Sequence, residues 1–252
     1  SDINSIEGRN YLDSLAVKTL SRIGTVRAVA DLPEEPVSHP PNQPMQPWLH
    51  ELTVIVDGPA TVLSRRDGQI SGHGAQGFFL DDSRVMSVLE VEVAGRAPDF
   101  VGGAARGATA QVLGSLRHLG DRGPDPSVEA LRRRHLDGAT LVEEIEIRNR
   151  ATETVHADLT VRVGGDGAEL ADVKQGIADG TQLVPAEVDG ASARWRTARH
   201  EVLLELDGIT AVHPSADGGL KVVAAIEVPS GGSSTVRLAV GATRTRQSLF
   251  DA

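Results

Sequence analysis

Aspartate–glycine pairs recur along most of this chain and constrain its fold more than any other feature. Aspartate tolerates a left-handed backbone and glycine has no Cβ to clash at positive φ, so the dipeptide suits the tight turns that close β-hairpins. Eight pairs occur, at residues 57–58, 67–68, 137–138, 166–167, 179–180, 189–190, 207–208 and 217–218. Short strands separated this regularly by turns indicate an antiparallel sandwich or barrel.

The segments between these turns alternate apolar and polar residues with period two, which predicts β-strands. The predicted strands cover residues 52–56, 85–93, 109–113, 141–147, 155–163, 202–206, 220–228 and 235–240. Residues 128–135 fit a short helix and a strand equally well. Helices of 10 to 15 residues do not separate the strands, which disfavours a parallel α/β sheet. The fold class predicted from these patterns is therefore all-β, an antiparallel sandwich or barrel.

The N-terminal region differs from the rest in composition, and we divide the chain into three parts. Residues 1–47 form an N-terminal extension with a short helix over residues 10–23 and six prolines between Pro33 and Pro47, which exclude helix and central strand there. An ordered arm and a flexible tether both fit this stretch. Residues 6–9 read IEGR, which resembles an engineered protease site or is a chance tetrapeptide. Residues 48–246 form the strand-rich domain, and residues 247–252 follow its last predicted strand.

Charge and composition exclude several function classes. The chain has 252 residues, with 25 Lys and Arg against 35 Asp and Glu, so its net charge is −10. An acidic surface repels phosphate backbones and anionic lipid, so we expect neither nucleic acid nor membrane as a partner. With 0 cysteines, disulfides, Cys-ligated metals and thiol nucleophiles are excluded. No stretch resembles a signal peptide or a membrane span, which predicts a cytoplasmic protein.

The sequence carries little sign of a catalytic or metal site. The eight histidines never occur at the i, i+2 or i, i+4 spacing that aims two imidazoles at one ion, so we expect no metal and no cofactor. Residues 72–77 match G-x-G-x-x-G, but Phe78 and Phe79 follow where a nucleotide-binding helix would begin, which favours a turn into a strand. The nucleophile elbow G-x-S-x-G is absent. Glu144 and Glu146 alternate with isoleucines, as on a solvated strand face.

Three segments resemble the N-terminal domain of bacterial glycogen-debranching-type enzymes, the amylo-α-1,6-glucosidase-like proteins. Residues 77–87, GFFLDDSRVMS, are similar to the family's G-L-F-x-x-D-T-R-x-L-S, with Asp82 and Arg84 at its Asp and Arg. Residues 141–149, LVEEIEIRN, resemble its strand ending in R-N, and residues 164–176, GGDGAELADVKQG, resemble its A-D-F-A-D-x-F-E-V-R-G segment. Ser83 replaces the family's Thr, and Glu169-Leu170 stands where D-F is usual.

The resemblance implies an antiparallel β-sandwich of the super-sandwich type, which is a noncatalytic domain of a glycoside hydrolase. It would pack against a C-terminal (α/α)₆ catalytic domain, to which residues 247–252 would begin the linker. This sequence lacks the helices to form that catalytic domain, and the β-sandwich would lend a loop to the α-glucan cleft. No catalytic residue is assigned in this chain. The candidates for ligand or domain-interface contact are Asp82, Arg84, Asp166 and Asp172.

Each candidate also has a purely structural interpretation. Two positions apart at a strand start, Asp82 and Arg84 can form an ion pair that fixes a loop. Asp166 and Asp172 can serve turn formation and loop polarity.

Two other functions remain open. The chain can be a free-standing module that binds carbohydrate or protein, although aromatic residues are only 3% of it and flat sugar-binding platforms need such rings. It can also be a small sugar-acting enzyme with His156 or His200 as base.

Overall fold

The computed structural model describes residues 49–178 and 180–245. The helix predicted over residues 10–23, the proline-rich arm and the linker at residues 247–252 lie outside the described residues. Within the described part, almost all regular structure is β-strand. The exceptions are a 3₁₀ turn, η2 (Leu49–Glu51), and one short helix, α2 (Leu170–Lys174).

One layer of the fold is a single sheet of eight antiparallel strands in the order β12–β13–β14–β17–β10–β9–β8–β7. Its strands are β7 (Asp99–Arg106), β8 (Thr109–Ser115), β9 (Val128–Asp137), β10 (Thr140–Asn149), β12 (Glu187–Asp189), β13 (Ser192–Arg196), β14 (His200–Asp207) and β17 (Ser233–Arg244). The segment that fitted helix or strand is the strand β9. It pairs with β8 on one side and β10 on the other.

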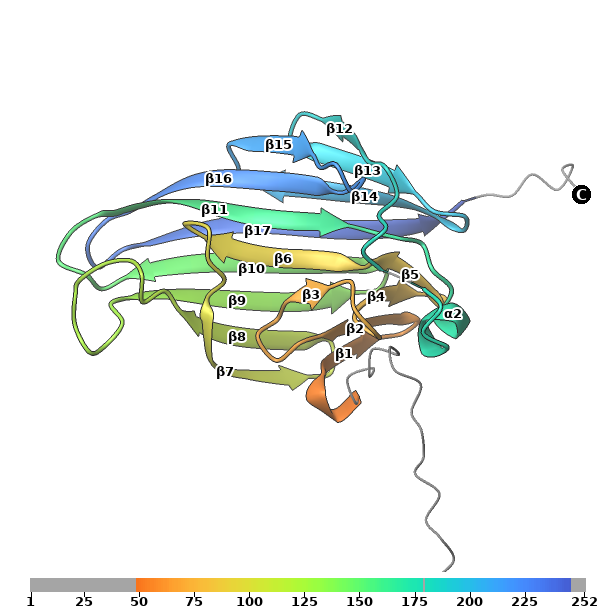
Figure 1. Cartoon of the computed structure of the whole chain (residues 1–252), viewed down its shortest axis with the longest axis horizontal. Coiled ribbons are helices and arrows are strands. Elements are labelled where there is room, and N and C mark those ends of the chain that lie inside the picture. The colour runs from red at the N-terminus through yellow and green to blue at the C-terminus, as the bar shows by residue number, and fades with distance from the viewer. Residues whose placement is uncertain (1–48, 179, 246–252) are drawn as a thin grey trace, which may run out of the picture. The chain divides into compact units, whose positions relative to one another are not determined.

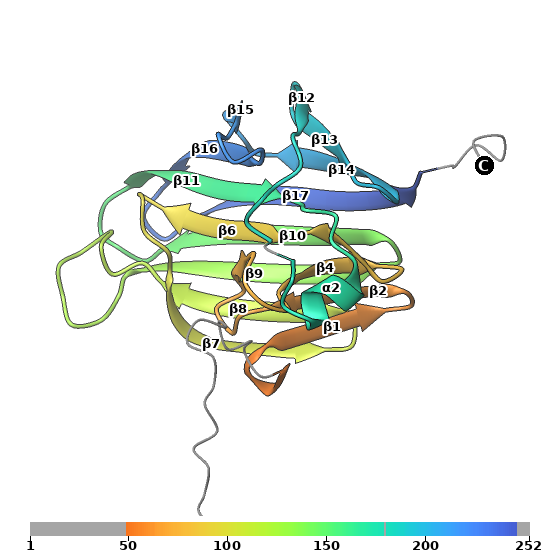
Figure 2. The same ribbon diagram turned by 45° about the vertical axis from the view of Figure 1, so that its right-hand side comes forward.

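The second layer consists of two smaller sheets. A five-stranded sheet has the order β15–β16–β11–β6–β3, with β15 (Ala211–Pro214), β16 (Leu220–Val228), β11 (Val155–Gly164), β6 (Val88–Val93) and β3 (Ile70–Ser71). A four-stranded sheet has the order β1–β2–β4–β5, with β1 (Thr53–Asp57), β2 (Ala60–Ser64), β4 (Gly77–Leu80) and β5 (Ser83–Met86). Figure 1 shows β11 and β6 in front of the long strands β17 and β10, and Figure 2 shows β1 beside the β7 end of the large sheet.

The core lies between these layers, because alternate residues of each strand turn inward. In β10, Leu141, Ile145 and Ile147 are buried, while Glu144 and Glu146 lie on the opposite face, as predicted. These isoleucines belong to one apolar cluster that also holds Val161 of β11 and Val222 of β16. The predicted all-β sandwich is therefore confirmed.

The predicted strand over residues 85–93 is wrong as a single element. Its two halves are β5 and β6, which belong to different sheets. Ser87 lies between them, where its N–H donates to the Gly164 carbonyl and its hydroxyl donates to the Gly180 carbonyl. At Ser87 the chain therefore leaves the four-stranded sheet and enters the five-stranded sheet, although the apolar pattern of the sequence continues without a break.

The turns behave largely as the aspartate–glycine pairs predict. Seven of the eight glycines have positive φ, with Gly180 the exception. Asp57-Gly58 closes the β1–β2 hairpin and Asp137-Gly138 the β9–β10 hairpin. Among the described residues, no helix has the length and apolarity needed to cross a membrane.

Candidate functional site

The first and third family-like segments meet at one end of the sandwich. The turn between β4 and β5 is Asp81-Asp82, and both residues have left-handed backbones, with φ of 49° and 63°. The Asp82 carbonyl accepts a hydrogen bond from the N–H of Leu170, the first residue of α2. The Arg84 N–H donates to the Ala168 carbonyl at 2.8 Å. Backbone bonds thus hold the β4–β5 turn against the loop that carries α2.

Arg84 is the centre of this junction and is completely buried. Its Nε donates to Asp166 Oδ1 at 3.0 Å and its Nη2 donates to Asp166 Oδ2, a bidentate pair. Nη1 donates to the carbonyls of Gly74 and Gln76, both at 3.1 Å. The glycine-rich segment at residues 72–77 is therefore a turn into a strand, as predicted, and two of its carbonyls also hold the Arg84 guanidinium.

The expected ion pair between Asp82 and Arg84 does not form. Asp82 points to solvent from the strained turn, while Arg84 turns inward to Asp166, which lies 82 residues along the chain. Asp166 is correspondingly more than a turn residue, because only 6% of its side chain is exposed. The prediction failed because an i, i+2 pair shares a face only in an extended chain, and the left-handed backbone at Asp82 breaks that regularity.

The exposed surface of this end comes from the turn and from α2. Asp172 lies on α2 and is exposed, and its carbonyl accepts the N–H of Ile177 at 3.0 Å. Ile177 follows the helix with 68% of its surface exposed. We call the three exposed residues Asp82, Asp172 and Ile177, on the turn, on α2 and after α2, the motif rim. A ligand or interface role for Asp82 and Asp172 stays a prediction.

His200 is the most unusual titratable group near the motif rim. Its ring is fully buried at the start of β14, and neither ring nitrogen has a hydrogen-bond partner. Burial lowers the pKa of His200, although Asp81 Oδ2 lies 3.9 Å from its Nε2. A ring with no exposed surface cannot reach a substrate on the surface, which argues against His200 as a general base. His156, the other candidate base, is an exposed residue of β11.

A second buried ionic cluster lies inside the large sheet. Arg132 and Arg134 of β9 each donate from Nε to one oxygen of Glu143 on β10, both at 2.6 Å. Burial raises the pKa of Glu143, but the two guanidinium charges and their hydrogen bonds outweigh it and hold the pKa below its usual range. Arg132 Nη1 also donates to Gln69 Oε1, and Arg134 Nη2 donates to the Gly68 carbonyl. The cluster therefore ties the β2–β3 loop to the large sheet.

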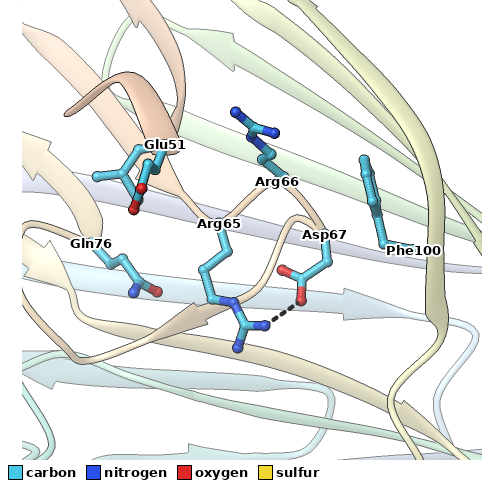
Figure 3. Close-up of a pocket in the computed structure, with 7 residues that line it drawn as sticks. Glu51, Arg65, Arg66, Asp67, Gln76 and Phe100 are labelled. Carbon is cyan, nitrogen blue, oxygen red and sulfur yellow. Dashed lines mark ion pairs between the residues drawn. The ribbon is translucent and has the colours of Figure 1, made fainter. Parts of the chain in front are cut away.

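A groove runs beside that loop. Two adjoining pockets of about 410 Å³ and 490 Å³ share Leu52, Arg66 and Phe100 in their walls. Figure 3 shows the Phe100 ring across the pocket from the Arg65–Asp67 ion pair, whose atoms are 2.9 Å apart. Phe100 is 47% exposed, whereas the other aromatic side chains in the described part, Phe78, Phe79 and Trp195, are buried. The described ranges contain no group of three or more His, Cys, Asp or Glu placed to hold a metal ion.

Comparison with known proteins decides the family. Residues 55–239 match the family described as the N-terminal domain of some glycogen debranching enzymes. The chain belongs to this family. The match covers all three segments that carried the resemblance in the sequence. No curated protein matches the chain.

One solved structure shows a similar fold within part of a longer chain. A human-microbiome protein assigned as a kojibiose phosphorylase is similar with a TM-score of 0.57 and 9% identity, covering 78% of this chain and 31% of its own. A galactose mutarotase related enzyme from Lactobacillus acidophilus has a TM-score of 0.49 and 11% identity, covering 76% of this chain and 97% of its own. At 9% identity, the similarity to the first of these two proteins shows a shared fold and nothing about function.

Sequence reasoning missed the buried ionic cluster of this glycogen-debranching-type domain, which consists of Arg132, Arg134 and Glu143. Arg132, Arg134 and Glu143 sit in segments whose alternation was readable, but their pairing depends on strand register. The unusual run of three arginines at residues 132–134 is the one signal that pointed to them. A strand in a sandwich turns alternate residues inward, so such a run must bury at least one charge and requires an acidic partner.

Proposed function

We propose that this chain is a noncatalytic N-terminal domain of a glycogen-debranching-like glycoside hydrolase, and that it packs against an (α/α)₆ catalytic domain. The observation that carries the proposal is the motif rim. Segments 77–87 and 164–176, which define the family resemblance, converge there on the buried Arg84–Asp166 pair. A buried bidentate pair fixes loops precisely enough to present Asp82 and Asp172 to a neighbouring domain.

The charged neighbours of the acidic residues support a noncatalytic role. A glycosidase needs one carboxyl whose pKa is raised, so that it can donate a proton near neutral pH. In the described part of the chain, every carboxyl whose pKa departs clearly from its usual value has a lowered pKa. These are Asp81, Glu143, Glu144, Glu146 and Asp217. Arginine neighbours keep all five carboxyls ionised. Ionised carboxylates of this kind serve in structural ion pairs and cannot donate a proton as a general acid.

We propose further that the loop of residues 164–176 borders an α-glucan cleft. Ionised carboxylates accept hydrogen bonds from sugar hydroxyls, and the exposed Asp172 side chain on this loop is such an acceptor. The proposed compartment is the cytoplasm. A chain with 0 cysteines forms no disulfides and therefore needs no oxidising environment.

The test is binding of the purified chain to a separately produced helical domain of a glycogen-debranching-type enzyme. Titration calorimetry should detect a complex with the unaltered chain, and Asp82→Lys with Ile177→Asp should weaken it about tenfold or more. The control is Glu227→Lys, an exposed position on β16 away from the rim. Failure to bind, or equal weakening by the control, would contradict the proposal. The chain alone should release no glucose from a branched α-glucan.

One observation favours a second function, a free-standing carbohydrate-binding module. The groove at Phe100 offers one exposed ring beside planar polar groups, a combination that suits sugar rings and their hydroxyls. Calorimetry with maltooligosaccharides separates the two functions. Binding by the isolated chain that is lost in Phe100→Ala and kept in Ile177→Asp would favour the module over the catalytic-domain partner.

A further inference from the structure

The outer edge of β7 is the longest unpaired strand edge of the eight-stranded and five-stranded sheets in the described part of the molecule. β7 ends the eight-stranded sheet, so no strand pairs with it on that side (Figure 1). Just beyond its end, the Gly107 carbonyl accepts the Val56 N–H of β1. The other outermost strands of this sheet and of the five-stranded sheet are short or blocked, since β12 has three residues, β3 has two, and β15 ends in Pro214. β7 has eight residues, DFVGGAAR, without lysine or proline.

The centre of β7 is uncharged and apolar. Phe100 and Val101 are 47% and 59% exposed, and Gly102 to Ala105 add small residues over which a second backbone can approach closely. On the neighbouring β1, Val54 and Val56 are also exposed, at 41% and 46%. Natural proteins usually protect such an edge, because it is a template for pairing with another chain.

The two charges of β7 stand at its ends and have opposite sign. Asp99 and Arg106 are both exposed, and neither makes an ion pair with another described residue. Asp99 pairs with Ser115 of β8, and Arg106 pairs with Thr109. Asp99 and Arg106 are seven positions apart, but Val101 is the extra residue of a bulge and has no partner on β8. The β8 partners of Asp99 and Arg106 are six positions apart, so both side chains lie on one face of the sheet.

This arrangement is self-complementary. Val112 lies midway between Ser115 and Thr109 on β8, and its partner on β7 is Gly103. A twofold axis through Gly103 would place a second β7 antiparallel to the first, with Gly103 facing its own copy. Asp99 of each copy would then lie opposite Arg106 of the other. Both ion pairs form at once, and the contact closes on itself as an isologous dimer.

We propose that β7 is a homodimerisation edge, at which a second copy of this chain continues the eight-stranded sheet. Backbone hydrogen bonds along the strands supply the attraction. The Asp99–Arg106 pairs set the antiparallel direction and the register. The interface is independent of the motif rim, which belongs to the turn between β4 and β5 and to α2.

The first measurement is sedimentation velocity of the chain over a concentration series. A species of twice the 26.5 kDa chain mass should grow with concentration. Asp99→Arg and Arg106→Asp, each alone, should weaken the dimer roughly tenfold or more, because each places like charges opposite one another at both ends. Asp189→Arg is the matched control. It makes the same charge change on the exposed outer strand β12 and should leave the dimer unaltered.

The decisive experiment mixes the two variants. A copy with arginine at both positions and a copy with aspartate at both are fully complementary, so an equimolar mixture should recover the dimer that each variant alone forms only weakly. This outcome also shows that both variants are folded. The proposal is overturned if the unaltered chain stays monomeric at every concentration, if either variant dimerises as well as the unaltered chain, or if the mixture stays monomeric. Val101→Lys, which charges the strand centre, should abolish the dimer in every combination.

Discussion

At the residue scale, the junction beneath the motif rim depends on one buried carboxylate. Asp166 neutralises Arg84, whose guanidinium has no exposed surface. Asp166→Asn keeps the shape and removes the charge, which leaves a buried cation without its partner. We expect a loss of about 3–5 kcal/mol in the free energy of unfolding, measured by urea denaturation. Asp172→Asn makes the same chemical change at an exposed position of the same loop and should stay within about 0.5 kcal/mol of the parent. Equal effects of the two changes would mean that the pair does not stabilise the domain.

The buried histidine gives a prediction about pH. The pKa of His200 is lowered from 6.5, so the folded chain resists a proton that the unfolded chain accepts. Stability should therefore fall as pH drops below about 6.5, because protons bind preferentially to the unfolded state. In His200→Gln the urea midpoint should fall less between about pH 7.5 and pH 5, a range chosen to stay above the carboxyl titrations. Parallel midpoint curves for parent and variant would rule out this role.

At the element scale, the Asn149 side chain fixes the end of β10 by hydrogen bonds. The buried Asn149 side chain donates to the carbonyls of Glu153 and Val228 and accepts the N–H of Ala151. Asn149→Asp keeps the shape of the side chain but replaces its NH₂ group with an oxygen. This oxygen cannot donate to the carbonyls of Glu153 and Val228. We expect a loss of about 1–3 kcal/mol in unfolding free energy, since buried acceptors are left unpaired. Unchanged stability in urea would show that water replaces these bonds.

The elements also show how far the sequence determines the fold. Alternation located most long strands, and β16 has the predicted bounds of residues 220–228. Alternation could not detect the break at Ser87, because the bonds that cause it come from Gly164 and Gly180, distant in the chain. The partner of Arg84 was equally out of reach, because period-two patterning shows which face of a strand is buried but not which distant segment lies beside it. The partners of Glu143 lie on the neighbouring strand of one hairpin, and the run of arginines at residues 132–134 pointed to them.

At the scale of the whole sandwich, the two layers are joined by charge as well as by apolar packing. Glu143 pairs with both Arg132 and Arg134, which in turn hold Gly68 and Gln69 of the second layer. Family membership was readable from local segments, whereas this connection between layers exists only in the assembled fold. Its contribution is testable by comparing the loss of one partner with the loss of all three.

Glu143→Gln should cost about 3–5 kcal/mol of unfolding free energy, because it leaves two buried guanidinium groups with too little negative charge. The pKa of Glu143 is lowered from 4.5, so this margin over the variant should be present at neutral pH and shrink as the pH falls below about 4.5. Replacing all three residues, as Arg132→Met, Glu143→Leu and Arg134→Met, removes the charges together and should recover much of the loss. Hydrogen exchange at Gly68 and Gln69 should nevertheless be faster in the triple variant, since the loop has lost its anchors to the large sheet. A triple variant less stable than Glu143→Gln would show that the hydrogen bonds of the arginines themselves, and not only the charge of Glu143, hold the layers together.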